Sequence, residues 1–579
     1  MDTDKFDRYV KSTMDSWHCP GASICIIRED EVIYQRAFGL RDTEKRLPLT
    51  EETRFPLGSV TKSITAMSAA LLVDDGLLDW DKPVLHYMPE FILDDAYATR
   101  HVTVRDMLSH RTGLPRYDFA SWRLNLPVSE FIKRMRFLKP SATFREKAQY
   151  TNIMYYAAGY LIEKIAGQRW DEFIAERIFS PLGMTASNFG PAFSGTDVPL
   201  AKGHRIERDD EGKFNRWTQL PFNRYTELSP GAAGALYSTL TDMIKWLKVH
   251  LGDGKFGDVR LVSKANLKQM HMPQMMIPTN DMGYAMSGLT MSAYGLGWMI
   301  RPYPYAAGTM ISHDGTIEGH CAIVGFVPES KIGVIVLTNA YAPQIPHILL
   351  REAMDRARGL PSQDWSARFH QTYAPIFAAA GKGNLVSIEA SQGSTPMSHP
   401  LEAYTGTYTS PGYPDFAVKL ENGKLYGCTV GSMPWSELNH QVLNTFEWIA
   451  SDWSERIKTR FVIDDNDEVG SVSLALAEGV PDIVFTRKPI MLSPETTSAI
   501  SGAYDGDVEG LVFSISGKDG KIYWQQMNEP AIEARPCKFD GSDLELRVSQ
   551  SRVLLIQTDR KFTHLVLQTP KAVYKATKR

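Results

Sequence analysis

Apolar residues follow two different periods in the first part of the chain. Residues 21–40 alternate apolar and polar positions across a charged turn, which predicts a hairpin with one buried face. Residues 59–72 place apolar side chains at helical spacing before a stop at Gly76, as expected of a buried helix. The same two patterns predict helices at 1–17, 103–110, 152–167, 170–179 and 240–251 and strands at 294–300, 309–313, 320–327 and 331–338. This order of elements predicts an α/β fold whose first and last strands share one sheet.

The pattern changes after about residue 360. A further helix is predicted at 363–379, and residues 380–399 are rich in Gly, Ser and Pro, as expected of a linker. The rest of the chain holds a weak internal repeat of about 90–100 residues. Its two copies open with YTGTY at 404–408 and ISGAY at 500–504, continue into a hairpin with an Asn-Gly or Asp-Gly turn, and close with IVFTRKP at 483–489 and AVYKATK at 572–578. Each copy is therefore predicted to close as a small antiparallel barrel.

We divide the chain accordingly into an α/β domain at 1–360, a helix and linker at 361–399, and two all-β, lipocalin-like barrel domains at 400–490 and 491–579. Exposed edges of such barrels would be compatible with a homo-oligomer.

Composition and charge narrow the functional classes. The 579 residues are 43% hydrophobic and 22% charged, an ordinary globular composition, and 63 basic against 67 acidic side chains give a net charge of −4. Such a balance provides no positive field for nucleic acid or an anionic membrane. The start of the chain lacks a secretory pattern, no apolar run approaches the roughly 18 residues of a membrane span, and the five cysteines form no C-x-x-C. These features predict a soluble cytoplasmic protein without a disulfide framework or a zinc cage.

Ser59-Val60-Thr61-Lys62 is the S-x-x-K motif of the chain and occurs once. On a helix, side chains three positions apart share a face, so the Lys62 amine can reach the Ser59 hydroxyl. A buried lysine with a lowered pKa can then remove the serine proton and activate a nucleophile, and the start of a helix favours the negative charge that develops. Alone, the motif is more often a capping serine followed by a solvated lysine.

Two later motifs change that balance. Tyr150-Thr151-Asn152 is the Y-x-N of the chain, again found once, and enters the helix predicted at 152–167. His313-Asp314-Gly315-Thr316 lies between two apolar strands. Taken singly, the first could be a helix cap with a packed aromatic ring and the second a plain hairpin turn.

In this order the three motifs resemble those of the serine β-lactamase and penicillin-binding-protein superfamily, especially its class C-like branch of esterases and D-aminopeptidases. The resemblance covers most of residues 1–345 and implies an α/β (α+β) domain with an antiparallel sheet flanked by helices, followed by the paired barrels of D-aminopeptidase relatives. The stretches that carry it are TVRDMLSHRTGLPRY at 103–117, AGYLIEKIAGQRWDEFIAERIFSPLGM at 158–184, PGAAGALYSTLTDM at 230–243 and YGLGW at 294–298.

The resemblance implies a role for each matching residue. Ser59 would attack a carbonyl and form an acyl-enzyme, while Lys62 and Tyr150 exchange the proton. Asn152 would hold the substrate amide or orient Lys62. The backbone N–H groups of Ser59 and Thr316 would form the oxyanion hole, with Thr316 directly after Gly315 on an edge strand. No metal and no organic cofactor are expected.

One position departs from the β-lactamase pattern. His313-Asp314-Gly315 stands where class C β-lactamases carry Lys-Thr-Gly, whose lysine helps bind a substrate carboxylate. A histidine is mostly neutral at pH 7, so this anchor is lost and efficient β-lactam hydrolysis is not expected. Gly315 would leave room for the acyl chain, and the barrels would project a loop into the cleft.

Three functions remain open at this stage. The leading hypothesis is a serine hydrolase that cleaves an amide, a peptide that can contain D-amino acids, or an ester in a small-molecule or peptide substrate. An acyltransferase or peptide cyclase would use the same acyl-enzyme, and a non-catalytic scaffold would use only the barrels. Intact Ser59, Lys62, Tyr150 and Asn152 argue against the scaffold.

Other segments are less specific. His110 is interpreted as a structural turn residue, His320 as a packed residue, and GAAGAL at 231–236 as close backbone packing near the site. Seven methionines crowd residues 270–291, either as gap-filling side chains or as an adaptable apolar lip over the acyl pocket. They are Met270, Met272, Met275, Met276, Met282, Met286 and Met291.

Overall fold

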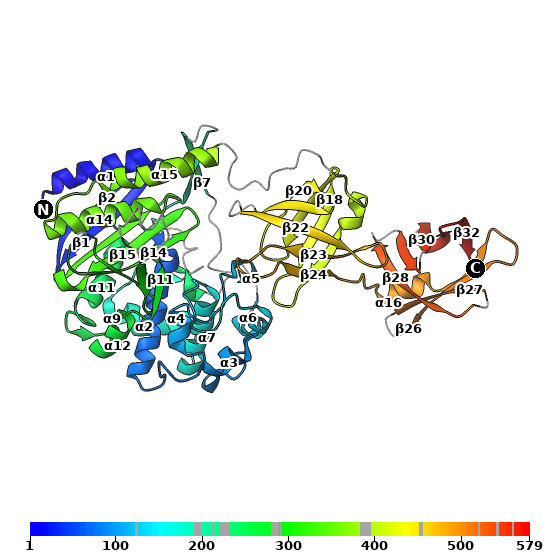
Figure 1. Ribbon diagram of the computed structural model, residues 1–579, viewed down its shortest axis with the longest axis horizontal. Coiled ribbons are helices and arrows are strands. Elements are labelled where there is room, and N and C mark those ends of the chain that lie inside the picture. Colours follow the sequence, from blue (N-terminus) through cyan, green and yellow to red (C-terminus); the bar gives the residue numbers. More distant parts are fainter. Residues whose placement is uncertain are drawn as a thin grey trace.

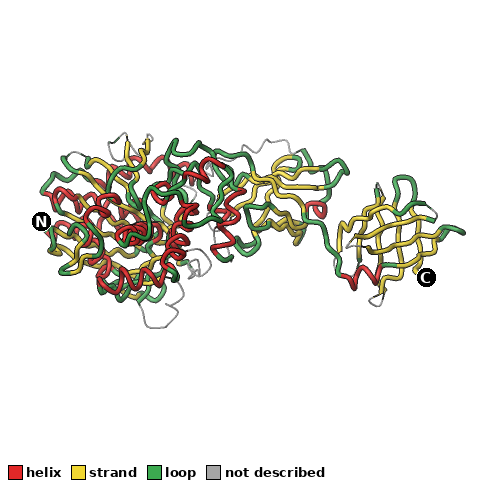
Figure 2. The backbone as a smooth tube through the Cα atoms, turned by 90° about the horizontal axis from the view of Figure 1, so that it is seen from below, coloured by secondary structure: helices red, strands yellow, loops and turns green. Residues whose placement is uncertain are grey.

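The computed structural model contains an α/β domain and two β-barrels in a row, with the N-terminus and C-terminus at opposite ends of the molecule (Figure 1; Figure 2). It describes residues 1–121, 126–189, 199–209, 213–220, 231–278, 289, 291–304, 306–381, 395–450, 455–518, 521–527, 529–539, 543–549, 551–558 and 561–579.

A nine-stranded antiparallel sheet forms the centre of the first domain. Its strand order is β11-β12-β13-β14-β15-β16-β1-β2-β3, so β1 from the start of the chain lies between β16 and β2. The prediction that early and late strands share one sheet is confirmed. The strands are β1 (Gly21–Arg28), β2 (Glu31–Asp42), β3 (Leu47–Pro48), β11 (Met275–Pro278), β12 (Met291–Tyr294), β13 (Met299–Pro302), β14 (Thr309–Ile317), β15 (His320–Val327) and β16 (Ile332–Thr338).

Helices cover both faces of this sheet, as Figure 1 shows. On one face lie α1 (Thr3–Trp17), α14 (Gln344–Arg358) and α15 (Trp365–Gly381), and the apolar stripe of α1 packs against Ile24 and Ile26. Cys25 and Ile27 point to the other face, which is covered by a larger helical layer. Because successive strand residues face opposite sides, β1 needs apolar residues at nearly every position, and GASICII provides them.

The helical layer contains the helices that the periodicity predicted. Residues 103–110, 152–167, 170–179 and 240–251 correspond to α4, α7, α8 with the π-helical turn η4, and α11. The elements of the layer are α2 (Thr61–Asp74), η2 (Val84–His86), α3 (Ala96–His101), α4 (Val104–Leu108), α5 (Asp118–Ser121), α6 (Val128–Arg134), η3 (Met135–Phe137), α7 (Ile153–Ala166), α8 (Trp170–Ile174), η4 (Ala175–Phe179), α9 (Ser180–Leu182), α11 (Leu240–Leu251) and α12 (Lys264–Met270).

Two strand predictions were wrong in their bounds. Residues 294–300 are not one strand, because β12 ends at Tyr294 and the chain turns through GLGW before β13. Gly297 adopts φ +77°, and a Cβ there would lie 2.7 Å from the Lys62 carbonyl oxygen, so glycine allows this turn to pack against α2. Conversely, His313 to Thr316 form no hairpin turn: β14 continues to Ile317, and the chain turns at Glu318 and Gly319.

The predicted barrels are both present as closed, eight-stranded antiparallel barrels. The first strand of each pairs with the last, β17 with β24 and β25 with β32. This closure leaves no exposed sheet edge in the described barrels, so the edge-based argument for a homo-oligomer does not hold. The strands are β17 (Gly406–Thr409), β18 (Phe416–Glu421), β19 (Lys424–Thr429), β20 (Ser436–Val442), β21 (Thr445–Ala450), β22 (Glu455–Ile463), β23 (Val469–Leu474), β24 (Ile483–Arg487), β25 (Gly502–Gly506), β26 (Val512–Lys518), β27 (Lys521–Gln526), β28 (Ile532–Phe539), β29 (Leu544–Val548), β30 (Ser551–Thr558), β31 (Lys561–Gln568) and β32 (Val573–Lys578).

The internal repeat is visible in the detail of the two barrels. Tyr408 donates its hydroxyl hydrogen to the Tyr404 carbonyl at 2.9 Å, and Tyr504 does the same to the Ile500 carbonyl at 2.7 Å. The glycines between them, at 406 and 502, adopt φ +140° and +143°. Each barrel thus begins with the same tyrosine-closed turn, preceded by η8 (Leu401–Tyr404) or by α16 (Pro494–Ile500).

The two barrels are attached differently to what precedes them. The apolar core of the first barrel is continuous with the core under α5 and α6, through ring contacts of Tyr117 with Tyr413 and of Phe119 with Trp448. The second barrel has its own separate core. It meets the first barrel through polar contacts, such as the Arg547 guanidinium donating to the Asn466 carbonyl at 2.9 Å, beside an inter-barrel cavity of about 1260 Å³.

Across the described ranges of the chain, none of the helices combines the length and the apolar character needed to cross a bilayer.

Candidate active site

Ser59 lies in a 3₁₀ turn, η1 (Gly58–Val60), that leads directly into α2. The turn is anchored by a small sheet in which β4 (Phe55–Pro56) pairs with β8 (Leu236–Ser238). The Leu57 N–H donates to the Leu236 carbonyl at 2.8 Å. No side chain caps η1 or α2, so Ser59 is not the capping residue that the motif alone would suggest.

Lys62 Nζ meets three acceptors. It lies 2.9 Å from Ser59 Oγ, 2.8 Å from Asn152 Oδ1 and 2.8 Å from the Ala233 carbonyl oxygen. These three acceptors match the three N–H bonds of an ammonium group. The spacing that predicted contact between Ser59 and Lys62 is therefore realised in the structure.

The segment GAAGAL packs its backbone against α2, as predicted. Its first residues form η6 (Gly231–Ala233), which supplies the Ala233 carbonyl to Lys62. One turn along α2, Thr65 donates its hydroxyl hydrogen to the Ala232 carbonyl at 2.7 Å.

Burial lowers the pKa of Lys62 well below its usual range, because the side chain has no exposed surface. The Arg116 guanidinium adds repulsion in the same direction, whereas the carboxylates of Asp118 and Asp314 oppose it. A lowered pKa increases the fraction of neutral amine at neutral pH, which is the form that can accept a proton from Ser59.

Asn152 precedes α7 but does not cap it. Its side chain instead bridges two charged residues: Oδ1 accepts from Lys62, and Nδ2 donates to Asp118 Oδ1 at 2.9 Å. Asp118 in turn accepts from Arg116 Nε. Sequence reasoning did not single out Arg116 or Asp118, although both follow the TGLP turn, Arg116 inside the family-like stretch at 103–117 and Asp118 directly after it.

Tyr150 places its ring 4.9 Å from Lys62 Nζ, and its hydroxyl hydrogen-bonds with Ser59. Burial raises the pKa of Tyr150, partly offset by that hydrogen bond, so the phenol is neutral at physiological pH. The Arg116 guanidinium lies 5.7 Å from the same ring.

His313 is buried and points into the site from β14. Its Nδ1 lies 2.6 Å from the Asp314 carbonyl oxygen and its Nε2 lies 2.7 Å from the Tyr294 hydroxyl. Because a carbonyl can only accept, Nδ1 carries the hydrogen and Nε2 accepts from Tyr294. Burial lowers the pKa of His313 to about 4, so the ring is neutral at pH 7, as the sequence predicted.

The C-terminal half of β14 approaches η1 very closely. Its partner strand β13 starts opposite Ser312, so residues 313–317 are unpaired on that side although β14 is not an edge strand of the sheet. A Cβ at Gly315 would lie 2.0 Å from the Leu57 carbonyl oxygen and 2.8 Å from the Ser59 nitrogen. The space beside Gly315 is therefore filled by the backbone of η1, and not left open for an acyl chain as expected.

The backbone nitrogens of Ser59 and Thr316 meet at this junction. A Cβ at Gly58, which has φ +52°, would lie 3.0 Å from the Thr316 nitrogen. Glycine at 58 and at 315 thus allows the two chain segments that carry the expected oxyanion-hole N–H groups to touch.

The two other histidines lie as expected. His320 is buried and lies 3.1 Å from the Ala201 carbonyl oxygen through Nε2. His110 has φ +60° at a turn, but its ring also packs against Tyr150 and Tyr294 at centroid distances of 4.4 and 4.5 Å. It therefore supports the site in addition to forming the turn.

Within the part of the chain that the structure describes, no three His, Cys, Asp or Glu side chains gather closely enough to hold a metal ion.

The family comparison agrees with this geometry. The family model described as Beta-lactamase matches residues 6–357, more than half of the chain. The chain belongs to this family. Its members share the β-lactamase-like serine hydrolase fold seen here, and a second model, described as a domain of unknown function (DUF3471), matches residues 390–493.

Three relatives extend beyond the family domain. An unguisins hydrolase of Aspergillus violaceofuscus is 27% identical over 77% of this chain and 82% of its own length. A second unguisins hydrolase, of Aspergillus campestris, is 29% identical over 70% of this chain and 76% of its own. Among solved structures, an octameric penicillin-binding protein homologue of Pyrococcus abyssi is 26% identical, covers 84% of this chain and 100% of its own, and superposes with a TM-score of 0.55. The chain thus belongs to a family of β-lactamase-fold serine hydrolases.

Proposed function

We propose that this protein hydrolyses an amide, peptide or ester bond through an acyl-enzyme formed on Ser59. The observation that carries this proposal is the buried Lys62 amine, with a pKa well below its usual range, 2.9 Å from Ser59 Oγ. The names of the two Aspergillus relatives, both hydrolases, support the reaction class.

In the proposed reaction, Ser59 Oγ attacks the substrate carbonyl carbon and its proton passes to Lys62 Nζ. The N–H groups of Ser59 and Thr316 would stabilise the oxyanion that forms. Tyr150, a neutral phenol beside Ser59, would relay the proton to the leaving amine or alcohol, and the intermediate collapses to the acyl-enzyme. Water then repeats the sequence, which releases the acid and restores Ser59.

The proposed substrate has no carboxylate beside β14. His313 is neutral and already hydrogen-bonded through both ring nitrogens, so it offers no permanent positive charge. We therefore favour an uncharged amide, peptide or ester at this position over a β-lactam with its carboxylate.

The first barrel is proposed to narrow the cleft. Glu455, at the start of β22, interacts electrostatically with Asp118 and Arg116 beside the Lys62 network, and with Tyr341 after β16. A barrel element that reaches this far would restrict substrates to small or end-exposed ones. We also keep a homo-oligomer as a proposal, because the Pyrococcus relative is described as octameric; light scattering would test it.

Labelling with a fluorophosphonate or a fluorescent penicillin tests the acyl-enzyme. The wild type should form a covalent adduct with at least one of these probes or with an activated ester, and Ser59→Ala should form none. Lys62→Ala should reduce the labelling rate at least about 100-fold, since general-base catalysis contributes about 10²–10⁴-fold. An unchanged rate in Lys62→Ala would contradict the proton route, and absence of any Ser59-dependent adduct would contradict the function.

A further inference from the structure

We propose that Asp118, with its partner Arg116, is a positioning residue that sets the proton affinity of Lys62 through Asn152. The inference rests on the proposed function, because it assigns how the base of that reaction is controlled.

The hydrogen-bond chain has a defined direction. Asp118 is a carboxylate and can only accept, so it holds the Nδ2 side of the Asn152 amide at 2.9 Å. The opposite end of the amide, Oδ1, must then face Lys62 Nζ at 2.8 Å. A flipped amide would place N–H groups against the lysine and its oxygen against the carboxylate. Asp118 therefore fixes the orientation of the Asn152 amide in which Oδ1 accepts from Lys62.

Two opposite charges, those of Asp118 and Arg116, also act on the Lys62 amine. The Asp118 carboxylate favours the ammonium form of Lys62, and the Arg116 guanidinium favours the neutral amine. Both residues lie within three positions of the chain and are bound to each other. Moving or removing one charge of this pair changes the electrostatic potential at Lys62 Nζ, while the contacts of Nζ with Ser59 and Ala233 stay in place.

Other groups around Lys62 are less suited to this role. His110 and His313 are neutral because burial lowers the pKa of each, and Tyr150 and Tyr155 are neutral phenols whose pKa values burial raises. Asp314 on β14 favours the ammonium form but forms its electrostatic contacts with His347 and Arg301 as well.

Glu455 adds a third charge from the first barrel. Burial raises the pKa of Glu455, the Asp118 carboxylate raises it further, and the Arg116 guanidinium lowers it. Its attraction for Arg116 means that the barrel contributes a carboxyl group to the environment of the pair.

The experiment measures the rate of Ser59 labelling by a fluorophosphonate against pH, because this rate reports the acylation step without knowledge of the natural substrate. The rate should rise with pH as Lys62 loses its proton, and the midpoint of this acidic limb gives the pKa of Lys62. Asp118→Asn keeps an oxygen that can accept from Asn152 but removes the negative charge, so the ammonium form becomes less stable and the midpoint should move to lower pH. Arg116→Gln should move it to higher pH. Each shift should be on the order of one pH unit.

Three control variants separate this role from a structural one. Arg116→Lys keeps the charge and should leave the midpoint near that of the wild type. Asp171→Asn removes the acid of an exposed ion pair with Arg169, far along the chain, and should shift nothing. Asp118→Ala removes the acceptor as well as the charge, so its plateau rate should also fall, by about tenfold or more.

The outcomes are distinguishable. Opposite shifts in Asp118→Asn and Arg116→Gln support the inference. Ser59-dependent labelling with equal midpoints in wild type, Asp118→Asn and Arg116→Gln overturns the inference and leaves the proposed function intact. Wild-type protein that no probe labels at Ser59 at any pH overturns both.

Discussion

At the scale of single residues, burial decides which chemistry each group of the site can perform. Burial opposes the charged form of all three groups: it lowers the pKa of Lys62 and of His313 and raises that of Tyr150. A neutral phenol and a neutral imidazole beside an amine of lowered pKa suit proton exchange with an uncharged substrate better than the capture of an anion. The histidine in the third motif therefore makes the whole site better suited to an uncharged substrate.

Gly315→Ala should nearly abolish activity and lower the melting temperature. The added Cβ would lie 2.0 Å from the Leu57 carbonyl oxygen, so β14 and η1 must separate and the Ser59 and Thr316 nitrogens move apart. Loss of an oxyanion-hole donor alone costs about 100- to 1000-fold in rate. Gly470→Ala is the matched control, because there the nearest atoms belong to the flexible Asp464 side chain. The labelling rate measures the activity of each variant, and thermal melting measures its stability. Wild-type values of both for Gly315→Ala would contradict the close contact.

Sequence reasoning found the side chains whose partners follow from spacing. Ser59 with Lys62 is an i, i+3 pair on consecutive helical turns, and their hydrogen bond was predictable for that reason. Asp118 and Tyr294 were not predicted, because each acquires its role only when α5 or β12 packs against a distant motif. Their residue types carry no local signal, and the family-like stretches around them were the only hint.

At the scale of elements, turns were harder to predict than helices and strands. The apolar run of β1 and the helical stripes of α1 and α7 each lie within one short window of the sequence, although β1 is buried on both faces and not on one as predicted. The end of β14 was misjudged because Asp-Gly favours a hairpin turn locally, whereas seven residue pairs with β15 keep the chain extended through Ile317. Tertiary pairing outweighed the local preference there.

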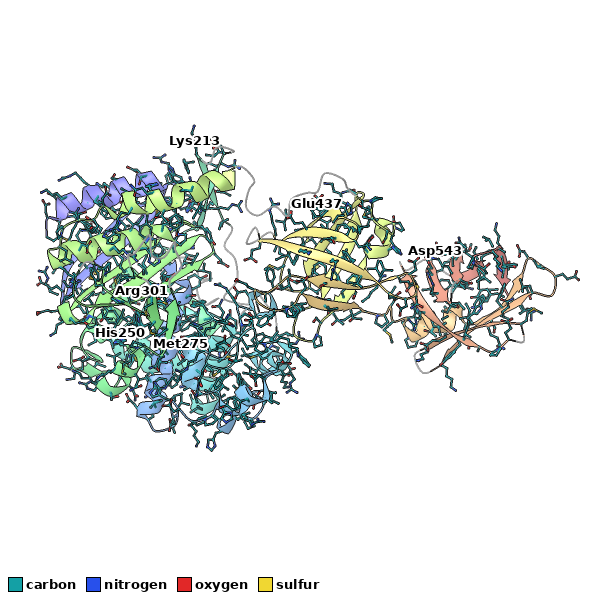
Figure 3. The ribbon with its side chains drawn as sticks, viewed as in Figure 1. Lys213, His250, Met275, Arg301, Glu437 and Asp543 are labelled. Carbon is teal, nitrogen blue, oxygen red and sulfur yellow. The ribbon has the colours of Figure 1, made fainter. Side chains whose placement is uncertain are left out.

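Met275 and Met276 allow a sharp test of the methionine lip. Met275 is partly buried and pairs directly with Tyr294, whose hydroxyl contacts His313. Met276 pairs with Ala293 and is 49% exposed (Figure 3 labels Met275 on β11). Met282 and Met286 lie outside the described residues.

Met275→Ala should raise KM severalfold for esters with bulky apolar acyl chains and little for acetyl esters. Met276→Ala, the matched control, should change neither. Equal kinetics of Met275→Ala and wild type across an acyl-chain series would favour the simpler interpretation of Met275 as a gap-filling residue.

At the scale of the whole molecule, the two barrels share one architecture but not one relation to the site. The first buries aromatic side chains against α5 and brings Glu455 toward Asp118. The second stands at the far end of the molecule with a core of its own (Figure 2). The division of the chain at 360, 400 and 490 stays a prediction, and truncation can test it.

A chain ending at residue 490 should keep its labelling rate within about twofold and lose little thermal stability, because the second barrel has a core of its own and meets the first through polar contacts such as that of Arg547 with Asn466. A chain ending at 399 should be destabilised, since Tyr117, Phe119 and Leu138 would no longer be buried by the first barrel. Each exposed side chain should lower the free energy of unfolding by up to about 2 kcal/mol. If it still folds, as judged by circular dichroism, it should accept larger acyl substrates. An unchanged substrate range would contradict the narrowing of the cleft by the first barrel.

The central position of β1 also bears on how the protein is made. During synthesis β1 emerges early, yet its neighbour β16 ends only at Thr338, so one edge of β1 stays unpaired until most of the α/β domain has left the ribosome. Each barrel, by contrast, pairs its first and last strands within fewer than about 90 residues and can close soon after its last strand appears. The nascent chain therefore exposes an apolar strand edge for a long interval, and chaperone dependence is expected to concentrate on the α/β domain.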